Sequence, residues 1–137
     1  MRWLLVLLAV AGIAAASLAL REHYRTDTSP CSINERWDCG IVNHSQFAVF
    51  HGVPVAVIGI AGYFLLGVMA LFRAYRWMLV PVLIAMGFSI YLANIEANVL
   101  GVWCIYCVIS LGIISLITLL VVVTALVSAF KRPKPAA

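Results

Sequence analysis

Two cysteines stand three residues apart in the segment Trp103-Cys104-Ile105-Tyr106-Cys107, where a long apolar run begins. On a helix, residues i and i+3 lie on the same face, so these two thiols can approach each other across one turn. The first turn of a helix also presents unpaired N–H groups and a partial positive charge, both of which favour thiolate over thiol. Because the thiolate is the reactive form of cysteine, we expect this pair to be redox-active.

A second pair, Cys31 and Cys39, lies in the one long polar segment of the chain, residues 22–52. A disulfide passes between sites by thiolate attack through a mixed disulfide, so a mobile pair beside a fixed pair can form a relay. Electrons would pass from a partner's dithiol to the loop pair, and then to Cys104 and Cys107. The expected final acceptor is a quinone, because the fixed pair lies where an oxidant dissolved in the bilayer can reach it.

Two alternatives give the cysteines no redox role. Four cysteines and three histidines could bind zinc. However, Cys31 and Cys39 are farther apart than usual ligand pairs, and an oxidising compartment disfavours four free thiolates, so we expect no metal. Both pairs could instead be inert disulfides of a non-enzymatic membrane protein, although a Cys-x-x-Cys bridge closes almost no loop and is a poor staple. His44 and His51 are more typical of solvated loop histidines than of thiol-proton relays.

The composition places these cysteines in a membrane protein. Hydrophobic residues make up 65% of the chain and the mean hydropathy is +1.10, whereas soluble domains are roughly 45 to 50% apolar. Crossing a bilayer takes about 20 largely apolar residues, and four runs meet that length. The net charge of +4 is held in short clusters, which gives no basic face for nucleic acid. We therefore expect an all-α membrane protein, a single four-helix transmembrane bundle over residues 1–137 with spans at about 3–20, 53–72, 77–96 and 102–130.

Residues 22–52 are expected to form a loop outside the bilayer. Asn43 and Gln46 have the spacing of a capping box and precede Val49 and Phe50, which predicts a short helix on the membrane surface. Pro54 should fall in the first turn of the second span, where a missing N–H costs little. The glycines of that span are expected to allow close helix packing.

Orientation follows from the basic residues, which accumulate on the cytoplasmic side of membrane proteins. In a four-span arrangement both termini are cytoplasmic, and all four cysteines lie on the extracytoplasmic side of the cell inner membrane, which is oxidising in bacteria. The first run is longer than the 7 to 15 residues typical of a signal peptide, which favours a retained anchor over a cleaved signal. The basic residues on the cytoplasmic side would be Arg2, Arg73, Arg76, Lys131, Arg132 and Lys134.

The chain resembles the vitamin K epoxide reductase family over roughly residues 31–110. Order and spacing agree along this stretch, which makes the likeness more specific than a single Cys-x-x-Cys motif. The matching features are the loop cysteines, a nearby serine, a His-Gly-Val-Pro-Val stretch and residues of the later spans: Cys31, Cys39, Ser45, His51 to Val55, Gly59, Tyr63, Tyr91, Leu92, Glu96, and Cys104 to Cys107.

The resemblance implies four helices around a quinone pocket. In that scheme Cys107 acts on the quinone, and Cys104 is its resolving partner. Cys39 is the loop cysteine that exchanges with Cys104, and Cys31 completes the shuttle pair.

Several other residues are candidates for the quinone site. The resemblance implies that Ser45 and the helix near it cover the pocket, and that Phe50 and Val55 line it. Trp103 and Tyr106 could stack on the quinone ring, although they suit an interfacial aromatic belt equally well.

Glu96 is the last candidate for this site. It lies about 30 Å along the third span from Trp77, and therefore near a membrane interface. This position is more typical of an interfacial charge than of a proton relay.

The resemblance also implies the reaction and its partners. Bacterial relatives drive disulfide formation in exported proteins, often through a fused C-terminal thioredoxin-like domain. This chain ends at Ala137 without one, so a separate extracytoplasmic thioredoxin-like protein is the expected partner. The predicted activity is a quinone-linked thiol-disulfide oxidoreductase that uses ubiquinone, menaquinone or a phylloquinone-type ring. Reduction of vitamin K or its epoxide is the alternative, which Leu111 disfavours because the animal enzymes have a tyrosine there.

Overall fold

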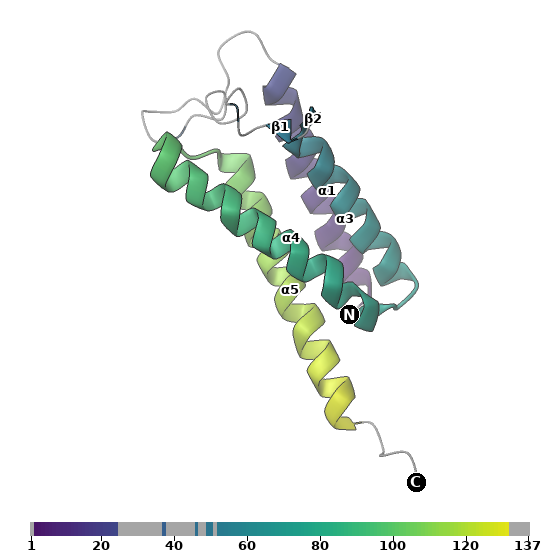
Figure 1. Cartoon of the computed structure of the whole chain (residues 1–137). Helices are drawn as coiled ribbons and strands as arrows, with labels where there is room; N and C mark the ends of the chain where they lie inside the picture. Colours follow the sequence, from purple (N-terminus) through teal and green to yellow (C-terminus); the bar gives the residue numbers. More distant parts are fainter. Residues whose placement is uncertain (1, 25–36, 38–45, 47–48, 51, 132–137) are drawn as a thin grey trace.

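The computed structural model describes residues 2–24, 37, 46, 49–50 and 52–131 (Figure 1). Within this part of the chain, nearly all of the structure is helical, as predicted. Two short strands form an antiparallel hairpin, β1 (Val49–Phe50) with β2 (Val53–Pro54). The helices are α1 (Arg2–Tyr24), α3 (Val55–Leu71), α4 (Tyr75–Ile95) and α5 (Ile105–Lys131), and the π-helix η2 (Glu96–Leu100) continues α4.

Three of these helical segments are long and apolar enough to cross a membrane: α1, α4 together with η2, and α5. The α3 helix has 17 residues, which span about 26 Å. That length is slightly shorter than the roughly 30 Å of hydrocarbon. Four membrane crossings therefore remain a prediction, although the four helices are present where the apolar runs indicated.

The structure corrects the predicted boundaries on both sides of the polar segment. The first helix continues through Tyr24 rather than ending at residue 20, so the loop begins later than residue 22. The second span was expected from residue 53, but Val53 and Pro54 form β2 and the helix begins at Val55. Pro54 is the N-cap of α3, with φ of −57° and ψ of 134°, because an extended backbone suits its fixed φ.

The predicted surface helix agrees with the structure at Gln46, which is 3₁₀-helical, but not farther along the chain. Val49 and Phe50, expected at its end, form β1 and pair with β2. Gly52 has a φ of +81° in the turn between the strands, a conformation that favours glycine, and Val and Phe are good strand residues. Asn43, the predicted N-cap, lies outside the described residues.

The α1 and α3 helices pack closely through small residues. The Ala9 Cβ lies 3.3 Å from the position that a Cβ on Gly67 would occupy, and the Ala16 Cβ lies 3.5 Å from the corresponding position on Gly59. At Gly12 any Cβ would overlap the ring of Tyr63, so the tyrosine lies directly on the α1 backbone. The expected close packing by glycines of this span is therefore present at two of its positions.

The buried core is formed by all four helices, and the outward surface is apolar. Large side chains such as Phe64 and Trp77 are exposed, as they are on a protein whose solvent is lipid. In Figure 1, α3 and α4 are joined by a short turn at one end and diverge toward the other end, where β1, β2, η2 and the start of α5 lie. The core residues are Leu5, Tyr63, Leu66, Ala70, Met78, Val82, Ile114, Ile117 and Val121.

Candidate active site

The site begins with the chain reversal between α4 and α5. The last turn of α4 widens into the π-helix η2, and Gly101 follows with a φ of +66°. The backbone N–H of Val102 donates to the carbonyl oxygen of Glu96 at 3.2 Å, which closes the turn. This reversal places the N-terminus of α5 beside the residue at which the π-helix starts, and π turns of this kind are frequent at functional sites.

The two cysteines of the Cys-x-x-Cys motif meet at the start of α5. Cys104 directly precedes α5, and its carbonyl oxygen accepts the N–H of Val108 at 3.0 Å, so it occupies the N-cap position rather than the first turn. Its side chain is fully buried, whereas Cys107 is half-buried. Their side chains hydrogen-bond to each other. The sequence prediction that they share a face is therefore confirmed.

The Glu96 carboxylate hydrogen-bonds to both cysteines of the Cys-x-x-Cys motif. Its Oε2 accepts the backbone N–H of Cys104 at 3.1 Å, and the carboxylate also hydrogen-bonds to the Cys107 thiol. Only 4% of the residue is exposed. The sequence favoured an interfacial charge here, but the structure encloses the carboxylate and gives it both cysteines as partners. A buried charge is costly unless it is hydrogen-bonded, and these two contacts supply that compensation.

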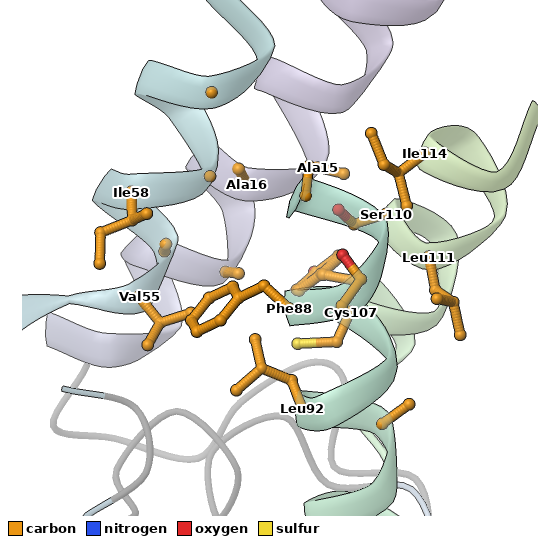
Figure 2. A pocket seen from close by; sticks show the side chains of 18 of the residues that line it. Ala15, Ala16, Val55, Ile58, Phe88, Leu92, Cys107, Ser110, Leu111 and Ile114 are labelled. Carbon is orange, nitrogen blue, oxygen red and sulfur yellow. The ribbon is translucent and has the colours of Figure 1, made fainter. Parts of the chain in front are cut away.

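A cavity of about 500 Å³ opens beside Cys107. All four helices contribute to its wall, which is mostly apolar. Figure 2 shows the Cys107 sulfur directed into this cavity, on the side of Phe88 and Leu92. Cys104 is not among its described lining residues, so the two thiols have different surroundings. A molecule in the cavity would meet Cys107 and not Cys104.

Five of the six residues predicted to bind a quinone line this cavity: Phe50, Val55, Glu96, Trp103 and Tyr106. The sixth, Ser45, lies outside the described residues. The sequence reasoning did not assign to the site the α4 residues Phe88 and Leu92, the alanines of α1 or the Tyr63 and Ser110 pair. Signals existed for three of these residues: Tyr63 and Leu92 belong to the family-like motifs, and Ser110 follows Cys107 by three residues and so shares its face.

Tyr63 and Ser110 place hydroxyl groups in the cavity wall. The Tyr63 hydroxyl donates to the Ser110 carbonyl oxygen at 2.8 Å and lies 2.8 Å from the Ser110 Oγ. Leu111 also lines the wall. The hydroxyl groups in this part of the wall therefore come from Tyr63 on α3 and from Ser110 on α5, the residue before Leu111.

Aromatic side chains connect the hairpin to α4. The Phe50 and Phe88 rings are 6.1 Å apart in an edge-to-face arrangement, and Phe88 stacks with Tyr91 at 6.3 Å. Such pairs contribute about 0.5 to 1.5 kcal/mol each beyond their buried area. Phe50 and Phe88 both line the cavity, so this cluster forms part of its wall where α3 and α4 diverge.

Besides Phe50, which lines the cavity, one more described residue of the polar segment touches the site. Trp37 forms a parallel β-bridge with Trp103, the residue before Cys104. The loop cysteines Cys31 and Cys39, predicted to act there, lie outside the described residues, as do His44 and His51. Within the described ranges, no three His, Cys, Asp or Glu side chains come together as a metal site would require.

The chain was compared with known proteins. A search among curated proteins finds no match. The model of the vitamin K epoxide reductase family matches residues 3–126, which is most of the chain. The chain therefore belongs to this family, as its cysteine and loop motifs had indicated. Membership assigns it to a class of membrane oxidoreductases associated with quinones and disulfides.

Proposed function

We propose that the protein oxidises the dithiol of an extracytoplasmic partner and passes the electrons to a membrane quinone. Electrons enter through Cys31 and Cys39 and reach the quinone through Cys104 and Cys107. The observation that carries this proposal is the Cys107 thiol, which faces an apolar cavity and hydrogen-bonds to the buried thiol of Cys104. One thiol of the pair is thus available to an oxidant in the cavity, and the other is available to complete a disulfide.

The cavity fits a quinone ring by size and by chemistry. Its volume of about 500 Å³ falls in the usual range of about 300 to 1,000 Å³ for small-molecule sites. The mostly apolar wall suits a lipid-soluble ring. In the reaction two S–H bonds break, one S–S bond forms, and two electrons and two protons convert the quinone to the quinol.

The relay from the loop is supported by the bridge between Trp37 and Trp103. In the sequence, Cys39 follows Trp37 by two residues and Cys104 directly follows Trp103. Two residues of extended chain reach about 7 Å. This tether favours exchange between Cys39 and Cys104, with Cys31 as the second thiol of the shuttle pair.

The partner is proposed to be a separate thioredoxin-like protein on the oxidising side of the inner membrane. The start of α5 lies at the opposite end of the bundle from the turn between α3 and α4 (Figure 1). That turn carries Arg73, and Arg76 follows in the first turn of α4. Since basic residues favour the cytoplasmic side, the cysteine end would be extracytoplasmic. Both chain termini would then be cytoplasmic.

The test uses purified protein in detergent with dithiothreitol as donor and a quinone as acceptor. Cys107→Ala should abolish quinone reduction, whereas Cys31→Ala should retain it because a small dithiol bypasses the loop. Ser115→Ala is the matched control. Ser115 lies on α5 outside the cavity wall, and its hydroxyl donates a hydrogen bond to the backbone carbonyl oxygen of Leu111. Normal turnover in Cys107→Ala would refute the proposal, and trapping a Cys39–Cys104 disulfide would test the relay itself.

A second candidate function is the reduction of vitamin K or its epoxide, as the family description suggests. Leu111 lines the cavity where the resembling animal enzymes carry a tyrosine, so the structure offers no hydroxyl at that position for an epoxide. We expect reduction of ubiquinone or menaquinone analogues to be faster than reduction of the epoxide. Relative rates with the same donor separate the two functions.

A further inference from the structure

We propose that Glu96 is a catalytic acid–base residue, which takes the proton of the Cys107 thiol and delivers it to the quinone oxygen. This inference rests on the proposed function, because it assigns a proton path to that same reaction. It concerns the one residue that touches both cysteines of the motif and also lines the cavity.

The contacts of Glu96 place its carboxylate beside the Cys107 thiol, and both residues line the cavity. One oxygen, Oε2, is held at 3.1 Å by the backbone N–H of Cys104, while the carboxylate also accepts the Cys107 thiol. The thiol is thus already hydrogen-bonded to the group that would remove its proton, which is the geometry that general base catalysis requires. Burial of the residue keeps bulk water from competing for this contact.

The composition of the cavity wall leaves few other groups for this role. Among the described residues that line it, Glu96 is the one carboxylate, and none is Lys, Arg or His. The other ionisable groups of the wall, apart from Cys107, are Tyr63 and Tyr106. The Tyr63 hydroxyl already donates a hydrogen bond to the Ser110 carbonyl oxygen. Among the described residues of the wall, Glu96 is therefore the carboxylate that is hydrogen-bonded to the Cys107 thiol and can accept its proton.

The proposed step balances with the reaction as a whole. The Cys107 S–H bond breaks and its proton passes to the Glu96 carboxylate, which leaves a thiolate and a neutral carboxylic acid. When the S–S bond with Cys104 forms, two electrons enter the quinone. Glu96 returns its proton to one quinone oxygen and is again a carboxylate, while the Cys104 thiol supplies the second proton. The sum is one dithiol and one quinone converted to one disulfide and one quinol.

The local fold keeps Glu96 at this position independently of its side-chain chemistry. Its carbonyl oxygen accepts the N–H groups of Gly101 and Val102, so the backbone of the residue closes the π turn. A glutamine at this position would retain the backbone bonds and an oxygen that can accept the Cys104 N–H. It could not take up a proton, so Glu96→Gln separates the proton transfer from the positioning of α5.

The experiment compares dithiothreitol-driven quinone reduction by the wild type, Glu96→Gln and Glu22→Gln. General acid–base catalysis typically contributes 10² to 10⁴-fold, so Glu96→Gln should be slower by about 100-fold or more. Glu22 is the matched control, because it is the other buried carboxylate among the described residues and does not line the cavity. Glu22→Gln should keep the wild-type rate. Turnover of Glu96→Gln within a few fold of the wild type would overturn the inference.

Infrared difference spectroscopy gives a second measurement that a purely structural role would not affect. When reduced wild-type protein is mixed with quinone, the C=O band of a protonated carboxylic acid should rise and decay within a single turnover. The band should persist in Glu22→Gln and vanish in Glu96→Gln. A turnover resolved in time without such a band would overturn the inference even if Glu96→Gln does not fold.

The outcomes also separate this inference from the proposed function. If the wild type reduces no quinone while Cys104 and Cys107 titrate as thiols, the proposed function fails. If the wild type is active, Cys107→Ala is inactive and Glu96→Gln matches the wild type, the function stands and the role of Glu96 fails.

Discussion

Replacing Gly12 with alanine should disturb both the stability of the bundle and the quinone cavity. A Cβ at this position would lie 2.6 Å from the Tyr63 Cζ, whereas ordinary contacts begin at 3.4 Å. The tyrosine ring must therefore move by most of an ångström. It cannot do so freely, because its hydroxyl is bonded to Ser110 on α5, one turn from Cys107.

The expected cost of Gly12→Ala is about 1 to 3 kcal/mol, the usual range for overpacking a well-packed core. The ring should also move toward the cavity, so the KM for quinone should rise. The assay is reversible unfolding in mixed micelles, followed by quinone kinetics on the same samples. Gly87→Ala is the control, because Gly87 lies in α4 with no described atom within 4 Å of the added Cβ. That variant should be neutral or stabilised by up to about 1 kcal/mol through helix propensity.

A double-mutant cycle shows whether Tyr63 is the cause. Tyr63→Leu removes the ring, so Gly12→Ala should cost much less in that background, with a coupling energy of about 0.5 to 3 kcal/mol between the two sites. The reasoning is refuted if Gly12→Ala unfolds like the wild type. It is also refuted if the two changes are additive, because the clash would then involve another group.

Three further changes test other contacts. Tyr63→Phe removes the bond to Ser110 and should lower the free energy of unfolding by about 0.5 to 1.5 kcal/mol; an unchanged unfolding curve would contradict this. Gly101→Ala puts a side chain at a φ of +66° and should cost about 1 to 2 kcal/mol in the same assay, with Gly101→Asn costing less. Trp37→Pro should weaken the backbone bridge to Trp103, because proline fixes φ and has no N–H; it should slow oxidation of a protein dithiol while leaving the rate with dithiothreitol unchanged, and equal slowing with both donors would argue against a role in the relay.

Much of the architecture could be predicted from the sequence because hydrophobic length is a strong signal. The four apolar runs became four helices, and the i, i+3 spacing of Cys104 and Cys107 brought their thiols together. The family resemblance was confirmed for most of the chain, and it also led to Val55 and Phe50 as cavity residues.

The remaining features depend on contacts that the sequence does not encode locally. Runs that are apolar on every side carry no periodic signal, so nothing indicated that Phe88 rather than its neighbours would face Cys107. The strand at Val49 depends on pairing with a later segment, whereas the capping-box spacing of Asn43 and Gln46 suggested a helix. The burial of Glu96 follows from a π turn, which no residue type marks.

The π turn also makes the geometry of the site depend on the length of the chain. A π turn holds one residue more than an α turn, and each residue of an α-helix advances the chain by about 100° around its axis. Deleting Asn98, an exposed residue of η2, would let this turn become α-helical without removing a residue of the cavity wall. The segment that follows would rotate relative to Glu96, and the N–H of Cys104 would leave its carboxylate. Homologous chains that keep every functional residue but lack this one position would therefore need a different group to hold the start of α5.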